Sequence, residues 1–251
     1  MKHLLIYICA FFFSLQMFAQ DNSSRYTKAN ELYESKNYNQ AINMYEDILK
    51  ANGASAEIYY NLGNAYYKNG QMGRAILNYE RCLKLDPGNE DVIFNLHLAN
   101  LRIKDQLQPV GELFIIQWWK NFINLGTAKT FGIISIIFIW ISLSAFALYR
   151  ISKKLKLRKL GFYSALITFI VFIFLLIATL SKMSYDKNYQ FAIILSPSAI
   201  IKSGPSESET NLTILHEGLK VQILDTDKNW TKVKMANGVI GWLMDSAIEK
   251  I

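Results

Sequence analysis

The sequence predicts a multidomain membrane protein with an α-helical repeat array, a two-helix transmembrane hairpin and a small all-β domain. Three observations lead to this fold class. Residues 26–84 repeat with a period of 34, a spacing typical of stacked supersecondary units. Two later stretches, 131–149 and 161–181, carry no charge and are long enough to cross a bilayer. From residue 190 onward, short apolar runs alternate with turn residues.

Identical residues mark the period of 34. The identical pairs are Tyr26/Tyr60, Asn30/Asn64, Tyr33/Tyr67, Ala41/Ala75, Ile42/Ile76, Tyr45/Tyr79, Glu46/Glu80, Leu49/Leu83 and Lys50/Lys84. The expected boundaries are 23–106 for the repeat domain, with units at about 22–55 and 56–89 and a capping helix after them. Gly63 and Ala75 are small enough to let two helices of one unit approach closely, and Tyr45 and Tyr79 would fill the groove to the next unit.

The repeated residues resemble the tetratricopeptide repeat. In the second unit, Leu62, Gly63, Ala75, Tyr79 and Pro87 fall where that family's signature expects them. The resemblance implies paired helices whose concave face binds peptides or partner proteins. The candidate partner-binding residues are then Tyr26, Asn30, Tyr33, Tyr60, Asn61, Asn64 and Tyr67. Their amides would bind a peptide backbone and their rings would anchor apolar side chains. The alternative is that these residues only support the fold.

The charge of the chain is concentrated between the two apolar stretches. The 27 Lys and Arg exceed the 20 Asp and Glu, which gives a formal net charge of +7. The segment 150–160 contains basic residues and no acid, and these topology residues are Arg150, Lys153, Lys154, Lys156, Arg158 and Lys159. The rest of the chain is near neutral and lacks the basic face of a nucleic-acid-binding domain. We therefore expect no nucleic-acid partner.

A membrane hairpin is expected from transmembrane helices at 130–149 and 161–181. A short loop rich in Lys and Arg, here 150–160, is retained in the cytoplasm. The N- and C-terminal domains of an inner-membrane protein would then face the periplasm. The spans lack ionisable side chains, which favours an anchor over a transport path. The segment 107–129 is expected to form a linker and an interfacial segment, because its Trp pair suits the membrane surface; a small helix packed on the repeat domain is the alternative.

Residues 1–19 have the pattern of a secretory signal peptide. A basic start precedes an apolar run over residues 4–13, and Ala19 precedes polar residues. The apolar run is shorter than a typical span of about 20 residues. An uncleaved N-terminal anchor is the alternative, and both interpretations predict that the following residues are exported.

Five short strands are expected in a C-terminal domain at 190–251. They are 191–195, 199–202, 220–225, 231–234 and 239–243, a number that suggests a small barrel. The steps Leu215-His216-Glu217-Gly218 and Gly241-Trp242-Leu243 resemble a bacterial SH3-like domain. This resemblance implies a module that binds cell-wall peptides or proteins. Trp230 and Trp242 are expected to form its core.

Residues that could carry chemistry are few. Cys82 would be the single cysteine after removal of the leader, which excludes an internal disulfide, and its position predicts a core residue. His97 lacks a partner at metal-ligand spacing, and His216 lacks a carboxylate at catalytic spacing. The sequence shows no paired carboxylates, nucleophile set or phosphate-binding glycine loop. We expect a non-enzymatic protein without catalytic residues, metal or cofactor.

The order of the parts resembles the BatE-type proteins of the Bacteroides aerotolerance (Bat) family. This resemblance covers essentially the whole chain. It implies an inner-membrane assembly with von Willebrand A-type partners and a MoxR-type ATPase, and an association with oxidative stress. The expected function is a scaffold that binds protein partners on the periplasmic side. Other Bat proteins are candidate partners. The alternative is an envelope sensor or tether that binds peptidoglycan peptides through the SH3-like domain.

Overall fold

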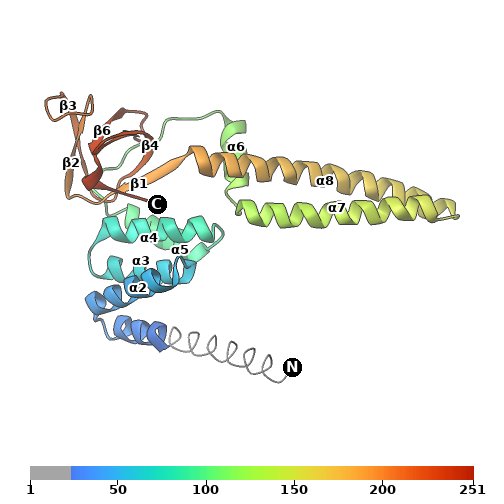
Figure 1. Cartoon of the computed structure of the whole chain (residues 1–251), viewed down its shortest axis with the longest axis horizontal. Coiled ribbons are helices and arrows are strands. Elements are labelled where there is room, and N and C mark those ends of the chain that lie inside the picture. Colours follow the sequence, from blue (N-terminus) through green and yellow to red (C-terminus); the bar gives the residue numbers. More distant parts are fainter. Residues whose placement is uncertain (1–23) are drawn as a thin grey trace, which may run out of the picture. The chain divides into compact units, whose positions relative to one another are not determined.

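The computed structural model describes residues 24–251, so the expected leader at 1–19 lies outside the described residues. The described chain divides into two compact units. One unit contains residues 24–85, 89–107 and 191–251, and the other contains 86–88 and 108–190. Figure 1 colours the chain from the blue N-terminal helices to the red C-terminal strands.

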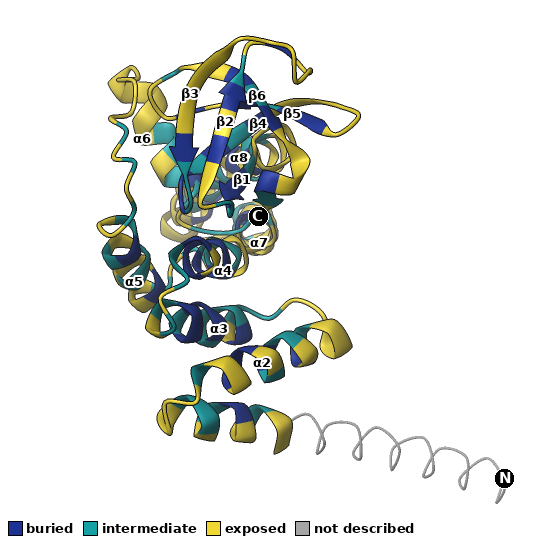
Figure 2. Ribbon diagram, turned by 90° about the vertical axis from the view of Figure 1, so that its left-hand side faces the viewer, coloured by how far each residue is buried: buried dark blue, intermediate teal, exposed yellow. Residues whose placement is uncertain are grey.

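The first unit begins with helices that follow the repeat. They are residues 24–34, α2 (Tyr38–Asn52), α3 (Ala56–Lys68), α4 (Met72–Leu85) and α5 (Glu90–Asn100). Each turns a buried stripe toward its neighbours (Figure 2). The turn after α3 contains Gly70, whose φ of +82° is left-handed. Asn89 caps α5, because its side chain accepts a hydrogen bond from the Val92 amide at 3.2 Å.

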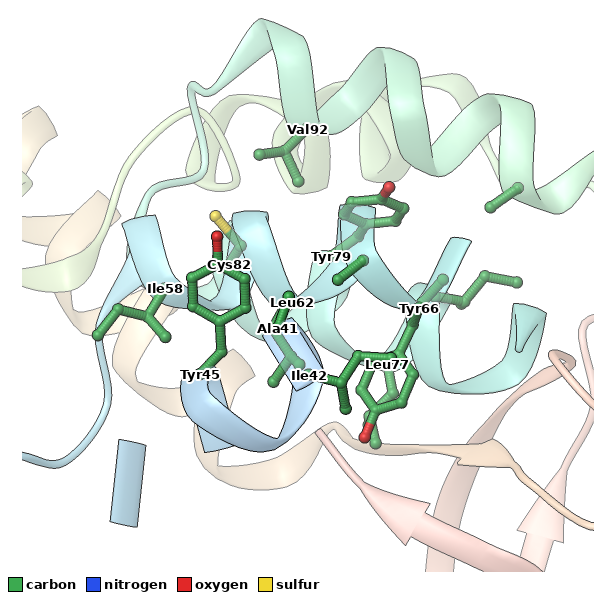
Figure 3. Close-up of a cluster of buried hydrophobic side chains, with 14 of the residues drawn as sticks. Ala41, Ile42, Tyr45, Ile58, Leu62, Tyr66, Leu77, Tyr79, Cys82 and Val92 are labelled. Atoms are coloured by element: carbon green, nitrogen blue, oxygen red, sulfur yellow. The ribbon is translucent and has the colours of Figure 1, made fainter. Parts of the chain in front are cut away.

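Large and small residues alternate in the core of these helices, as the period predicts. Tyr45 and Tyr79 are each 1% exposed and lie in the buried cluster of Figure 3. Gly63 packs against the ring of Tyr79, since a Cβ there would lie 2.6 Å from ring atom Cε1. Cys82 is fully buried in the same cluster, which confirms that it is a core residue.

The C-terminal strands of the same unit form a seven-stranded sheet. They are β1 (Gln190–Ile194), β2 (Ser198–Lys202), β3 (Asn211–His216), β4 (Lys220–Asp227), β5 (Trp230–Lys234), β6 (Ile240–Met244) and β7 (Ile248–Lys250). The strand order is β3-β2-β6-β5-β4-β1-β7. Since β3 and β7 end this order and no pairing joins them among the described residues, the sheet is open. The small barrel expected from the sequence is therefore not confirmed.

The sequence pattern predicts neither β3 nor β7. β3 leaves Leu212 and Ile214 exposed, so burial along it does not alternate, and β7 contains only 3 residues. Trp230 is buried, as expected. Trp242 is only partly buried, and the Lys232 ammonium lies 5.8 Å from the centre of its ring. The core prediction therefore holds for one of the two tryptophans.

The second unit contains the helices α6 (Phe114–Ile123), α7 (Ala128–Ile151) and α8 (Leu155–Asn188). Both α7 and α8 are long and apolar enough to cross a membrane, by length and composition. The turn between them is residues 152–154, so most of the expected basic loop is helical. The two helices pack closely: the Ser142 hydroxyl donates a hydrogen bond to the Ala165 carbonyl at 3.0 Å.

Gly161 is expected to control this close packing. In Gly161→Ala, the new Cβ would lie 2.7 Å from the Tyr149 nitrogen and 2.9 Å from the Ala145 carbonyl, and backbone atoms cannot yield without moving α7. We expect a loss of about 1–3 kcal/mol of hairpin stability, measured by SDS titration of the full chain in mixed micelles. The matched control is Gly132→Ala, which meets only the Thr179 Cγ2 at 3.8 Å and should be neutral or stabilising. Equal shifts for both variants would contradict the prediction.

Candidate partner-binding site

The predicted tyrosine and asparagine side chains form a hydrogen-bonded group in the first repeat. The Tyr45 hydroxyl donates to Asn30 Oδ1 at 2.6 Å. The Asn61 amide donates to the Tyr26 hydroxyl at 2.6 Å and to Asn30 Oδ1 at 3.4 Å. Tyr26 in turn donates to a Glu57 carboxylate oxygen at 2.6 Å. One group of side chains therefore joins helix 24–34 to α2 and α3.

The same group recurs 34 residues later. The Tyr79 hydroxyl donates to Asn64 Oδ1 at 2.7 Å. The Asn95 amide donates to Asn64 Oδ1 at 2.9 Å and to the Tyr60 hydroxyl at 3.5 Å. We call these two groups together the Tyr–Asn ladder. Because α5 supplies Asn95, the capping helix completes the second group in the way that α3 completes the first.

The ladder uses the carbonyl oxygens of Asn30 and Asn64 to hold the fold together. The Asn30 amide also hydrogen-bonds the Tyr26 hydroxyl, which lowers the pKa of Tyr26 against the effect of burial. The Asn64 NH₂ group donates no hydrogen bond among the described residues, where no buried polar side-chain atom lacks a partner. The Asn64 amide therefore keeps a donor that the described residues do not use. In such an asparagine the carbonyl oxygen supports the fold, and the amide nitrogen of the same side chain is the candidate group for binding a partner.

Tyr33 and Tyr67 lie beside the ladder and are partly buried. The Tyr33 ring meets the Tyr38 ring edge-on at a centroid distance of 5.5 Å. The Arg102 guanidinium lies 4.5 Å from the centre of the Tyr67 ring, within cation–π distance. The period could not indicate Arg102, because residue 68, its equivalent, is a lysine at the end of α3.

Burial raises the pKa of three ladder hydroxyls, those of Tyr26, Tyr45 and Tyr79. Desolvation, followed by the hydrogen bond to Glu57, raises the pKa of Tyr26 to about 12. Desolvation also raises the pKa of Tyr45 and of Tyr79 well above the ordinary value. Tyr45 and Tyr79 therefore remain donors to the asparagine carbonyls, and Tyr26 remains a donor to Glu57, across the physiological pH range.

The sheet docks on α4 through polar contacts at its edge. The Lys220 ammonium contacts a Glu80 carboxylate oxygen at 2.6 Å. The Arg81 guanidinium contacts a Glu249 carboxylate oxygen at 2.8 Å and donates to the Lys250 carbonyl at 2.7 Å. These pairs join residues far apart in the sequence, so no local pattern indicates them.

His216 contacts the carboxylate of Asp105, which is far from it in the sequence. Its Nδ1 lies 3.0 Å from Asp105 Oδ1, and its backbone amide donates to Asp105 Oδ2 at 2.6 Å. Lys104 Nζ lies 2.9 Å from His216 Nε2. Both ring nitrogens are thus occupied by docking contacts. In the described part of the chain, no three His, Cys, Asp or Glu side chains are grouped to hold a metal.

Apolar residues lie at the centre of this docking contact. Ile193 of β1 is fully buried in the cluster formed by the repeat helices. A Cβ at Gly73 of α4 would lie 3.2 Å from the Ile194 carbonyl, so the helix and strand backbones approach closely. The docking contacts described here leave the seven predicted site residues uninvolved. The sheet is therefore a built-in part of the repeat unit, and its docking does not use the ladder residues.

Comparisons with known proteins agree with the repeat. The family described as tetratricopeptide repeat matches residues 26–90. No protein with a curated description matches the chain. A solved structure titled "MamA RS-1 ArsTM double mutant" shares 30% identity over 32% of this chain and 46% of its own, with a TM-score of 0.31. The Sgt2 TPR domain from Aspergillus fumigatus shares 25% identity over 32% of this chain and 54% of its own, with a TM-score of 0.31.

The matched region contains every member of the ladder except Asn95. The chain spans about half the length of these two structures. Repeats of this family are protein-interaction modules and typically lack enzymatic activity. Residues 26–90 therefore carry tetratricopeptide repeats.

Proposed function

We propose that this protein is a membrane-anchored scaffold that binds an extended segment of a partner protein along the Tyr–Asn ladder. The observation that carries the proposal is that the carbonyls of Asn30 and Asn64 serve the fold, while the Asn64 amide keeps a donor that no described residue uses. Each amide is held by a carbonyl that is already hydrogen-bonded, so little side-chain entropy is lost when a peptide carbonyl binds. The rings of Tyr33 and Tyr67 supply apolar contacts beside the two donors.

The hairpin supports a membrane anchor. Both α7 and α8 are suited to spanning by length and composition. The basic residues gather where these helices meet, from Arg150 to Lys159, and such a segment is retained in the cytoplasm. In this topology both ends of the hairpin lead to the periplasmic side of the inner membrane. The order of parts adds the proposal that the partners are other Bat-type proteins with von Willebrand A-type domains, in an aerotolerance complex.

A second candidate function is a tether in which an SH3-like sheet binds peptidoglycan peptides. Ile200 of β2 pairs with Ile214 of β3, and their side chains are 45% and 55% exposed. Exposed apolar pairs of this kind favour a binding surface. Ile214→Lys should then reduce sedimentation of the full chain with purified peptidoglycan without changing partner recovery.

The scaffold proposal is tested by Asn30→Asp together with Asn64→Asp. Each replacement keeps the oxygen that Tyr45 or Tyr79 needs and removes the NH₂ donor. Loss of two hydrogen bonds at about 0.5–1.5 kcal/mol each should lower partner recovery about tenfold. The measurement is quantitative co-purification from membranes of the native host.

The matched control carries the same change in charge elsewhere on the repeat. Gln40→Glu with Asn43→Asp alters two exposed residues outside the ladder. Hydrogen exchange should show that both double variants remain folded. If the ladder variant recovers the same partners as the control, the ladder is not the binding site.

A further inference from the structure

Helix α6 is packed against α8 on one side. The Trp119 ring meets the Phe174 ring edge-on at a centroid distance of 5.8 Å, and the Phe122 ring lies 5.2 Å from the same ring. Ile123 is 2% exposed in this cluster. Figure 1 shows α6 beside the C-terminal half of α8. The position of α6 is therefore fixed by aromatic contacts within its own unit.

The contact with α8 covers only part of the apolar surface of α6. At about 100° per residue, Ile115, Trp118 and Phe122 share one side of the helix. The Ile115 and Trp118 side chains are 64% and 46% exposed, and Figure 2 draws much of α6 as exposed. Further exposed apolar residues on the helix and next to it are Val110, Leu113, Phe114, Ile116 and Leu125. A patch of this size on one short helix requires a cover.

The opposite side of α6 is polar. Gln117, Lys120 and Asn121 fall there by the same helical spacing. Lys120 is the single charged residue of α6, and its ammonium contacts the Glu112 carboxylate at 2.5 and 2.7 Å. The helix therefore has one side suited to water and one suited to an apolar medium.

A buried lysine places α6 at the end of the apolar part of α8. Lys182 is 9% exposed; its ammonium donates to Asn124 Oδ1 at 2.8 Å and pairs with Asp186 Oδ1 at 3.0 Å. The residues of α8 from 160 to 181 carry no charge. Phe174 lies about two turns, or roughly 12 Å, on the apolar side of Lys182. The C-terminal end of α6 thus lies beside Lys182, where the uncharged part of α8 ends. The rings of Trp119 and Phe122 contact Phe174 within that uncharged part.

We infer that α6 lies in the lipid interface, with the Ile115 and Trp118 side covered by acyl chains and headgroups of the periplasmic leaflet. The inference rests on the proposed membrane location of the hairpin. It commits to lipid because α6 packs through Trp119 and Phe122 on the hairpin itself, whose apolar side chains are exposed as well: Ile136 of α7 and Ile170 of α8 are 56% and 59% exposed. An amphipathic helix in this setting lies along the interface with its apolar side buried about 5–10 Å, and its Trp residues suit that depth.

Spin-label accessibility in vesicles tests this position. The full chain, with Cys9→Ser and Cys82→Ala, is labelled at Ile115→Cys or Trp118→Cys and reconstituted in phosphatidylethanolamine–phosphatidylglycerol vesicles. We expect both labels to collide with oxygen and to exclude the water-soluble nickel complex Ni-EDDA. The ratio of the two accessibilities should be several-fold higher than for the matched label Gln117→Cys on the polar side.

Labels at Ile136→Cys and Ile170→Cys separate failure of this inference from failure of the anchor. If these two labels lie in lipid while those at 115 and 118 meet Ni-EDDA, α6 is in water and the inference is wrong. If labels 115 and 118 exclude both reagents and show spin–spin broadening that unlabelled chain removes, a second copy covers the surface and the inference is again wrong. If labels 136 and 170 also meet Ni-EDDA, the membrane anchor itself is wrong.

Discussion

Tyr79→Ala is expected to destabilise the repeat unit by about 3–5 kcal/mol. The side chain is 1% exposed and its ring fills the space left by Gly63. Truncation would leave a cavity between α3 and α4 and would remove the donor to Asn64. Since whole domains have stabilities of about 5–15 kcal/mol, this single change consumes a large share of the total.

The conservative variant Tyr79→Phe separates packing from hydrogen bonding. It keeps the ring and removes the hydroxyl, and Asn64 still accepts from Asn95, so the cost should be about 1 kcal/mol. Hydrogen exchange of the α3 and α4 amides, measured on the full chain in micelles, should quicken at least a hundredfold in Tyr79→Ala and about fivefold in Tyr79→Phe. Similar exchange in the two variants would show that the ring does not fill the groove.

The period of the sequence predicts the repeat core because packing between stacked units constrains residue size. Gly63 and Tyr79 are an example: position 63 must lack a side chain because the Tyr79 ring occupies the space where a Cβ would lie. The period also predicts that Tyr26 and Asn30 share surroundings with Tyr60 and Asn64. It does not predict which atoms bond to each other: the carbonyls of Asn30 and Asn64 both accept from a buried tyrosine, and only the Asn64 amide keeps an unused donor among the described residues.

The docking of the sheet could not be predicted, for a different physical reason. Lys220 and Glu80 are separated by 140 residues, and each alone is an ordinary charged residue on a surface. Likewise, His216 contacts Asp105 in the fold although the whole hairpin lies between them in the sequence. The edge strand β3 escapes prediction because its exposed apolar residues lack the alternation that marks a half-buried strand.

Gly218→Ala is expected to weaken the docking of the sheet on the repeat helices by roughly 2–5 kcal/mol. Gly218 has a φ of +91°, which costs a residue with a Cβ about 1–2 kcal/mol. The added Cβ would also overlap the Cγ2 of Ile103 and lie 3.2 Å from the Cδ1 of Ile76. Its amide donates to the Ile194 carbonyl at 2.8 Å, so the residue cannot move away without breaking a link between the loop and β1.

Gly70→Ala isolates the docking part of this cost. Gly70 has a φ of +82°, and no atom lies within 4 Å of a Cβ placed there, so only the backbone cost applies. Hydrogen exchange should become faster at β1 and along the side of α4 that contacts the sheet in Gly218→Ala. It should stay unchanged there in Gly70→Ala. Equal effects would mean that Ile103 and Ile76 yield freely and that the sheet is only loosely held.

Because the ladder residues make none of these contacts, partner recovery should be unchanged in Gly218→Ala. A loss of recovery would show that the docked sheet contributes to the binding surface.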